Sequence, residues 1–406
     1  MKIKKLSFKN YKAFPGIQTI ELKPITVLIG KNSSGKSSIA KLFTMLENSL
    51  SGEIDVPMLL NNNEVCLGGE FRDLVYNQDP STPIEFNIVF EDDSKMFVSI
   101  IQPISSPSPI ILKWCHKNKS LDDFCFTYDE KNGKYERQGL TYDINFKGFI
   151  PNFIHSGDDI EDLSTLDNLT KNIKVDYIGP FRLVPPRGFL LSGKQEYYKM
   201  GIFGENAYNI LGNNMLRDKL LVKQVGDWYE KNFDGWNLEV SNALSPFNQI
   251  LLHKSENPDV KINIIDVGQG MSQALPLVVR AFMEDDNSLV VLEQPELHLH
   301  PAAHGDMAEL FANSTLTKNH NYIIETHSEN FILRLRKLIA DDSSKLQPED
   351  VIIYSIEHDE SNEPYLLEIT INNKGELSDW PDGVFTENLD EIQAINRVLK
   401  VDKKKA

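Results

Sequence analysis

The chain has few cysteines and no long apolar run. Its 406 residues include only Cys66, Cys115 and Cys125. These are too few for a disulfide framework, so we expect free thiols in a cytoplasmic protein. No apolar run approaches the roughly 18–20 residues of a membrane-spanning helix, and no apolar signal core follows the basic start of the chain. The sequence therefore predicts a cytoplasmic protein without a membrane segment.

The chain also lacks the positive charge of a general nucleic-acid binder. Its net charge is −17, which argues against a broad, non-specific grip on DNA. The balance is uneven, because residues 1–50 contain nine lysines and two glutamates and carry +7, so the rest carries −24. The basic start is either a solvated lysine face near a nucleotide or a local nucleic-acid surface, so nucleic-acid binding stays possible.

A phosphate-binding loop of the form GxxxxGK[ST] occupies residues 30–37. The β-branched run at 25–29 predicts a buried strand before it, and apolar residues at helical spacing follow it, which is the context that this motif requires. We expect Lys36 to reach the β- and γ-phosphates of ATP and the Ser37 hydroxyl to bind Mg²⁺. The predicted nucleotide-binding residues of the loop are Gly30, Asn32, Ser33, Ser34, Gly35, Lys36, Ser37 and Ser38.

A second glycine-rich turn spans residues 266–273 and opens onto an apolar helix. Ser272 is a plausible N-cap, and Pro276 would then fall in the first turn. Gly268, Gly270 and Ser272 could present N–H groups and a hydroxyl to an anion. The residues alone leave open whether this is a binding site or a simple helix-capping turn.

Two further strands end in groups that suit the same chemistry. Residues 288–293 read as a buried strand that ends in Glu293, the Walker B arrangement that holds Mg²⁺. Residues 322–328 read as another strand, with His327 placed to contact the γ-phosphate and position water. Between them, Pro301 is suited to open a helix. The nearby His298, His300 and His304 suggest either a turn that touches a second subunit or a metal site.

In this order, the four elements resemble ATP-binding-cassette (ABC) ATPases of the RecF, SMC and OLD branch. The 232 residues between Lys36 and Gly268 exceed what a compact transporter cassette allows. Residues 3–14, 177–182, 204–206 and 380–385 are similar to stand-alone prokaryotic ATPases often encoded in anti-phage defence loci. The resemblance implies a homodimer, or alternatively a higher oligomer, in which Gly268, Gly270 and Ser272 contact ATP held by the partner subunit's Lys36.

The sequence departs from that family directly after the Walker B strand. Glu293 fills the metal-binding position, but Gln294 stands where the family has a water-activating glutamate. An amide cannot accept a proton near neutral pH, so it cannot act as a general base. ATP hydrolysis could therefore be slower by about 10²–10⁴-fold. Glu296 could reach the water instead, or His327 could position it. We expect slow turnover; the alternative is a clamp held by ATP.

The predicted fold is an α/β P-loop NTPase, an ABC-type ATPase head without coiled-coil arms, because no sustained heptad occurs. We expect a single head over 1–406, with an acidic mobile loop or short helix at 156–170. Its parts are the P-loop lobe (1–50), a mostly β insertion (51–175), a helical subdomain (176–260), the signature, Walker B and His lobe (261–345), and a C-terminal β cover and tail (346–406).

Three functions fit this sequence. The first is an ATPase that senses an invader or damaged nucleic acid and controls a separate effector, because only about 65 residues follow the 327–340 segment, too few for a nuclease domain. The second is a RecF-like ATPase that acts directly on DNA, and the third is a scaffold locked by nucleotide. Arg182 and Arg187 could reach a phosphate or a partner carboxylate, or form surface ion pairs.

Overall fold

The computed structural model describes residues 2–380 except for 63–64, 105, 119–120, 157–158, 162–168, 170 and 285–287. The expected mobile loop at 156–170 and the tail after Trp380 therefore lie largely or wholly outside the described residues. Within the described residues, no helix is both long and apolar enough to cross a membrane.

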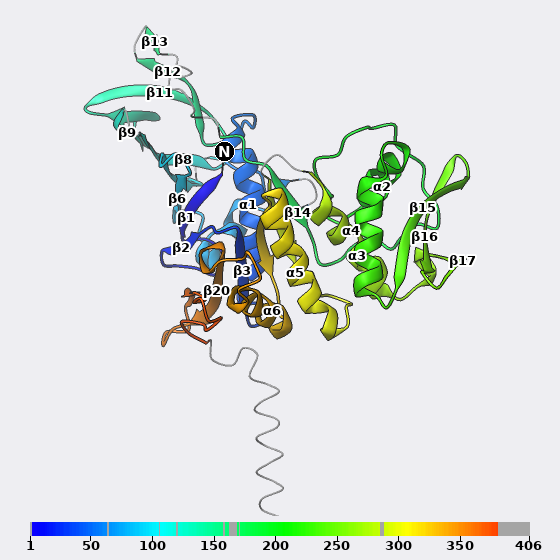
Figure 1. Cartoon of the computed structure of the whole chain (residues 1–406). Helices are drawn as coiled ribbons and strands as arrows, with labels where there is room; N and C mark the ends of the chain where they lie inside the picture. The colour runs from blue at the N-terminus through cyan, green and yellow to red at the C-terminus, as the bar shows by residue number, and fades with distance from the viewer. Residues whose placement is uncertain are drawn as a thin grey trace, which may run out of the picture.

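A six-stranded sheet forms the centre of the molecule (Figure 1). All neighbours in it are parallel except the last pair, β20 and β21. The strand order is β14 (Val175–Ile178), β18 (Leu289–Glu293), β19 (Asn321–Glu325), β3 (Ile25–Gly30), β20 (Val351–His358) and β21 (Pro364–Ile369). Strands β14, β18, β19 and β3 are buried along almost their whole length because both faces are covered, as is usual for parallel sheets.

Helix α1 (Lys36–Ser51) covers one face of this sheet and separates it from a second, antiparallel sheet. Phe43 and Leu46 of α1 share a core with Val291 of β18 and Phe86 of β6. The antiparallel sheet has ten strands: β1 (Ile3–Lys9), β2 (Gln18–Glu21), β6 (Ile84–Phe90), β7 (Lys95–Ile101), β8 (Ile110–Asn118), β9 (Leu121–Asp129), β10 (Lys134–Arg137), β11 (Leu140–Lys147), β12 (Ile150–Ser156) and β13 (Asp159–Glu161). A short hairpin, β4 (Asn61–Asn62) with β5 (Val65–Cys66), follows α1.

Three helices cover the other face of the core sheet. They are α4 (Gln269–Phe282), α5 (Pro301–Lys318) and α6 (Glu329–Ala340), and they pack on Val27 and Leu292. Pro301 opens α5, as predicted. Helix α5, with 18 residues, is the longest helix in the described ranges, so no long coiled-coil arm occurs there.

The predicted helical subdomain is only half helical. Helices α2 (Ala207–Leu216) and α3 (Leu220–Asn232) form as expected, but the stretch from Trp236 onward folds into three antiparallel strands. The reason is a period of two, with Leu238, Val240, Ile250 and Leu252 buried on one face. The strands are β15 (Trp236–Leu244), β16 (Phe247–Lys254) and β17 (Asn257–Asn263), at the right of Figure 1.

Two further expectations are corrected by the pairing of strands. Cys115 of β8 and Cys125 of β9 lie opposite each other and form a disulfide, with Cα atoms 4.1 Å apart, so only Cys66 is a free thiol. The predicted C-terminal hairpin forms, but it is no mere cover. Strand β20 pairs directly with the P-loop strand β3 and completes the core sheet.

A buried ion pair attaches the glycine-turn helix α4 to the core sheet. The Arg280 guanidinium donates to the Asp176 carboxylate at 2.5 Å and to the Ser288 hydroxyl at 2.7 Å. Asp176 also accepts the Met200 N–H at 2.9 Å. Because Arg280 and Asp176 are both 1% exposed, the pair depends on this full set of partners.

Candidate functional site

The P-loop connects β3 to α1 at the carboxyl edge of the core sheet. Gly30 and Gly35 have φ values of 140° and 107°, which L side chains rarely adopt, and a Cβ at Gly35 would lie 3.0 Å from the Phe14 ring. Lys36 is 3% exposed, and its ammonium donates to the carbonyls of Gly30 and Lys31 at 3.0 and 2.7 Å. Burial lowers the pKa of Lys36, and the nearby Glu325 carboxylate partly offsets this.

The serines and the asparagine of the loop differ in exposure. Asn32 and Ser33 are exposed on the loop, and Ser33 has a φ of 62°. Ser34 is buried, and its hydroxyl has no hydrogen-bond partner. Ser38 lies in the first turn of α1, where its carbonyl accepts the Tyr11 hydroxyl at 3.1 Å. The loop therefore carries an unsatisfied hydroxyl beside the N-terminus of a helix, a place that suits an anion.

Two carboxylates meet beside Ser37. Glu293 ends β18, and Glu325 ends the neighbouring β19 in register with it. The Ser37 hydroxyl donates to Glu325 Oε2 at 2.7 Å, while Glu293 hydrogen-bonds to the Tyr177 hydroxyl. The other Glu293 oxygen, Oε1, is buried without a partner. Burial is the main cause that raises the pKa of Glu293 to about 7, and it also raises the pKa of Glu325.

These groups fit a magnesium ion. Mg²⁺ takes oxygen ligands and keeps the carboxylates around it ionised. An orphaned buried carboxylate oxygen on Glu293 and the Ser37 hydroxyl are the donor types that a nucleotide-bound Mg²⁺ uses in P-loop NTPases. The predicted metal ligands, Ser37 and Glu293, therefore lie at the same edge of the sheet.

The turn after β18 holds Gln294 in an uncommon conformation. Gln294 has a φ of 45°, and its N–H donates to the Glu325 carbonyl at 2.8 Å. A left-handed backbone at a non-glycine residue costs about 1–3 kcal/mol and persists only where neighbours enforce it. The enforcing contact here runs to β19, the strand that also carries Glu325.

Glu296 and His327, the two alternative residues predicted to act on the water, lie next to each other. Glu296 Oε1 accepts the His327 backbone N–H at 2.7 Å, and its Oε2 is buried without a partner. His327 keeps part of its surface exposed, and its partial burial, followed by the Lys36 charge, lowers the pKa of its ring. A carboxylate with one fixed and one free oxygen thus stands next to the histidine.

Arg182 and Arg187 have opposite surroundings. Arg182 is 6% exposed and donates to the carbonyls of Glu293 and Gln294 at 3.2 and 2.9 Å. Its Nε and Nη1 groups are buried without partners. Arg187 is exposed and pairs with Asp266 at 2.5 Å, the surface alternative considered above.

The glycine-rich turn begins helix α4 one turn earlier than predicted. Gly268 caps the helix, Ser272 is inside it and donates to the Gln269 carbonyl at 3.1 Å, and Pro276 is in its interior. The prediction of Ser272 as the N-cap is therefore wrong. A Cβ on Gly270 would lie 2.9 Å from the His298 carbonyl, so this turn packs against the turn that follows the Walker B strand.

Two of the clustered histidines, His300 and His304, form hydrogen bonds at the N-termini of helices α5 and α6. His300 caps α5 by accepting the Ala302 N–H at 3.3 Å, and His304 bonds to Ser328 at 2.8 Å. Over the described residues, no group of three or more histidine, cysteine or acidic side chains is arranged to hold a metal by itself. The local contacts favour a structural role for these histidines over a separate metal centre.

Glu325 and Tyr177 were missed as site residues. Each lies in a stretch that the sequence analysis singled out, but their proximity to Glu293 depends on the order of β14, β18 and β19. A buried carboxylate at the end of a strand that neighbours the P-loop strand was the available signal for Glu325.

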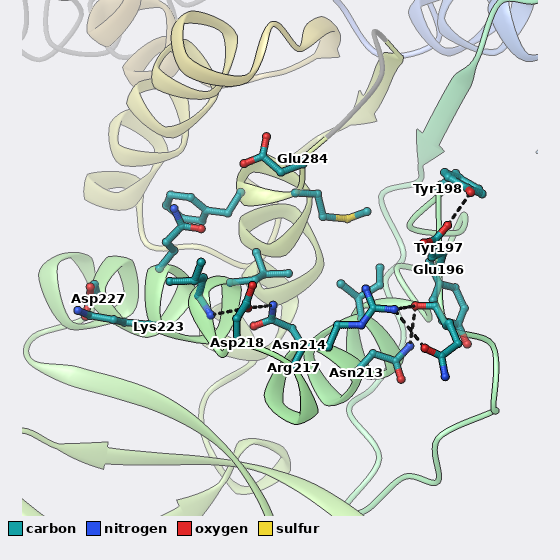
Figure 2. Close-up of a pocket in the computed structure, with 17 residues that line it drawn as sticks. Glu196, Tyr197, Tyr198, Asn213, Asn214, Arg217, Asp218, Lys223, Asp227 and Glu284 are labelled. Atoms are coloured by element: carbon teal, nitrogen blue, oxygen red, sulfur yellow. Dashed lines mark hydrogen bonds between the residues drawn. The ribbon is translucent and has the colours of Figure 1, made fainter.

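A hollow of about 690 Å³, shown in Figure 2, is lined by no residue of the P-loop. Its walls come from residues 195–198, from α2 and α3, and from the end of α4. Arg217 donates to the Gln195 side chain at 3.2 Å at one side of it. None of the predicted site residues lines this hollow, so it is not part of the nucleotide site.

The chain resembles solved SMC head domains in fold. A structure of the SmcHead bound to the C-winged helix domain of ScpA aligns with a TM-score of 0.50 and 13% identity, over 91% of this chain and 98% of that one. The SMC head domain from Thermotoga maritima aligns with a TM-score of 0.44 and 12% identity, over 90% and 98%. The Pyrococcus furiosus Smc head domain bound to the C-terminal domain of ScpA aligns with a TM-score of 0.45 and 11% identity, over 98% of this chain and 99% of that one.

Family models give the more specific result. No curated protein matches the sequence. The model of DUF3696, a protein family of unknown function, matches residues 346–395. The model of the AAA ATPase domain AAA_15 matches residues 1–180 and 209–332, more than half of the chain. The chain therefore belongs to the AAA ATPase domain family, with an α/β P-loop fold that resembles the SMC head.

Proposed function

We propose that this protein binds ATP with Mg²⁺ and hydrolyses it slowly to ADP and phosphate. The observation that carries this proposal is the meeting of Lys36, Ser37 and Glu293 at one edge of the core sheet, with Glu293 Oε1 orphaned. Burial of these groups strengthens their electrostatic interaction with phosphate and metal. Bound Mg²⁺ would neutralise the charge that develops on the β- and γ-phosphate oxygens.

The chain's own residues then have distinct tasks. The Lys36 ammonium leaves the Gly30 and Lys31 carbonyls and binds phosphate oxygens, and the loop N–H groups surround the same phosphates. Because Gln294 cannot take a proton, we assign the positioning of water to Glu296, through its free Oε2, and to His327. Slow turnover of ATP follows from the presence of Gln294 in place of a water-activating glutamate.

We further propose that ATP binding joins two copies of the chain. Gly268 and Gln269 are exposed at the N-terminus of α4, a 14-residue helix, where free N–H groups favour an anion. With the family pattern, Gly268, Gly270 and Ser272 would meet ATP held by the partner subunit's Lys36. Light scattering with ATP should show a dimer that Lys36→Ala does not form; an unchanged monomer would contradict the proposal.

The wider role that we propose is control of a separate effector in anti-phage defence. Its support is the resemblance of the motifs to stand-alone defence ATPases. Phage titres on cells that express the protein with its neighbouring genes should rise when Lys36 is replaced by alanine. Equal titres would argue against defence, and stimulation of turnover by added DNA would favour the RecF-like alternative.

The decisive experiment is ATP turnover by the purified protein with Mg²⁺, with Lys36→Ala as the blank. Turnover that disappears in the blank establishes the ATPase. Gln294→Glu should then raise the rate by at least tenfold, because it restores a general base. Glu296→Gln should lower the wild-type rate. Bound ATP without any turnover would instead make the protein a nucleotide-locked scaffold.

A further inference from the structure

A second glutamate stands beside the Walker B carboxylate. Glu293 and Glu325 are register partners on two adjacent parallel strands, so their side chains point to the same face of the sheet. They are 5% and 4% exposed. Two ionised carboxylates buried on neighbouring strands are costly unless a cation lies between them or one of them takes up a proton.

We propose that Glu325 is a direct ligand of the Mg²⁺ that accompanies ATP, together with Ser37 and Glu293. This inference rests on the proposed function, since it concerns the same site. It adds that the chain supplies two carboxylates to the ion and therefore binds a divalent cation measurably before nucleotide arrives.

The spacing of the oxygens supports direct ligation. Mg²⁺ is octahedral with ligands at about 2.0–2.1 Å, so two adjacent ligand oxygens lie about 2.9 Å apart. Ser37 Oγ and Glu325 Oε2 lie 2.7 Å apart. A small adjustment would let both oxygens face one ion, with the serine proton turned away.

An orphaned atom points to the same place. Glu293 Oε1 is buried without any hydrogen-bond donor, although its carboxylate also hydrogen-bonds to Tyr177. Buried polar atoms without partners are rare and call for a ligand or an ion. Lysines of the chain lie near these carboxylates but form no ion pair with Glu293 in the described part of the chain. Lys36 donates to the P-loop carbonyls, and Lys41 acts on Glu293 and Glu325 only as a nearby charge.

The strand that carries Glu325 also fixes the turn beside the proposed metal site. The Glu325 carbonyl accepts the Gln294 N–H at 2.8 Å, so β19 holds the turn that follows Glu293. Ligation by Glu325 would therefore connect the metal to the Gln294 turn and to Glu296, which holds the His327 N–H two residues after Glu325. The ion, the turn and the histidine would move as one unit.

The test uses Mn²⁺ as the probe on the full chain without nucleotide. Electron paramagnetic resonance counts free Mn²⁺, and pulsed measurements in D₂O count the water molecules bound to the protein-held ion. Glu325→Gln should weaken Mn²⁺ binding at least tenfold and raise the number of bound waters by one. Glu293→Gln should do the same. The matched control is Glu357→Gln at the carboxyl end of β20, which should change neither value.

The water count separates a ligand from a residue that only orients Ser37. Loss of an outer partner also weakens metal binding, by about 10–100-fold, but it leaves the number of bound waters unchanged. Weaker Mn²⁺ binding with an unchanged water count would therefore overturn the proposal, as would unchanged affinity. Circular dichroism of each variant confirms that it is folded.

Failure of this inference is distinguishable from failure of the proposed function. A fluorescent ATP analogue should bind the wild-type chain and the Glu325→Gln variant in EDTA, and bind Lys36→Ala much more weakly. If the analogue binds as expected but Glu325→Gln keeps its Mn²⁺ affinity, only the second carboxylate ligand is wrong. If the wild-type chain binds no nucleotide, the proposed function itself is wrong.

Discussion

Two groups of buried charged side chains lie close to the core sheet, and only one is satisfied by the chain itself. Arg280 and Asp176 fill their hydrogen bonds with each other and with Ser288 and Met200. At the carboxyl edge of the sheet, Arg182 and Glu293 keep buried polar atoms without partners, and so do Ser34 and Glu296. The first group stabilises the fold, whereas the second lacks the partners that a bound nucleotide and metal would supply.

The contrast has an energetic meaning. A buried pair whose partner is removed loses stability because one charge is left alone. A buried carboxylate with one oxygen left without a partner, such as Glu293, costs stability in the folded protein, and its replacement by an amide relieves part of that cost. Substitutions in the two groups should therefore change stability in opposite directions.

The largest expected effect is at the satisfied pair. Arg280→Met leaves Asp176 buried and unpaired, so the free energy of unfolding should fall by about 3–5 kcal/mol in urea denaturation. The exposed pair of Lys231 and Glu309 provides the control, and Lys231→Met should cost less than about 1 kcal/mol. If Arg280→Met lowers the free energy of unfolding no more than the control does, the buried pair does not stabilise the fold as proposed.

The next largest effect is a gain in stability when Glu293 is replaced, opposite in sign to the loss expected for Arg280→Met. Because its folded pKa of about 7 is above the unfolded value of 4.5, the folded protein holds this proton more tightly, and stability falls as the pH rises from 4.5 to 7. Glu293→Gln should remove up to about 3 kcal/mol of that fall. Urea denaturation in EDTA at pH 5 and pH 8 measures it, and parallel pH profiles for wild type and variant would refute it.

A smaller effect is expected at Arg182, which donates to the Glu293 and Gln294 carbonyls. Arg182→Lys keeps the charge but loses the planar fork, so the turn should be held less firmly. We expect kcat for ATP to fall about tenfold, or about 1.4 kcal/mol, with KM within twofold. A change in KM alone would mean that Arg182 serves nucleotide binding rather than the position of the turn.

The smallest effect should occur at Arg187, the exposed neighbour of Arg182 in sequence. Its ion pair with Asp266 is solvent-exposed, so water replaces it readily. Arg187→Ala should leave the thermal midpoint and the turnover of the nucleotide-bound protein unchanged within error. A clear loss of activity would show that Arg187 meets a ligand or a second subunit.

The local motifs of the site were predictable from the sequence, and its cross-strand contacts were not. The P-loop strand and the strand that ends in Glu293 each depend on a short run of residues and form where the sequence places them. The third strand, predicted over 322–328, forms at Asn321–Glu325 and ends before His327. The neighbour relation of Glu293 and Glu325 depends on the register of β18 and β19. Sequence spacing of 32 residues carries no information about that register.

The errors have the same physical origin. Cys115 and Cys125 become partners because β8 and β9 pair in one particular register. The strands after Trp236 were predicted as helix because the helical pattern of α3 was continued past its end, over the alternation of Leu238 and Val240. Ser272 was chosen as a cap on residue type, but Gly268 begins the helix because the chain turns against His298.

The position of β3 in the core sheet has a consequence for synthesis on the ribosome. This strand ends at Gly30, but both of its neighbours, β19 and β20, come roughly 300 residues later. At about 5–20 residues per second, the P-loop strand waits about 15–60 s for its partners. During that time helix α1 can pack on the strand, but neither of its two strand partners has been made. Nascent chains that stop before residue 351 therefore leave one edge of β3 unpaired and open to chaperones and proteases.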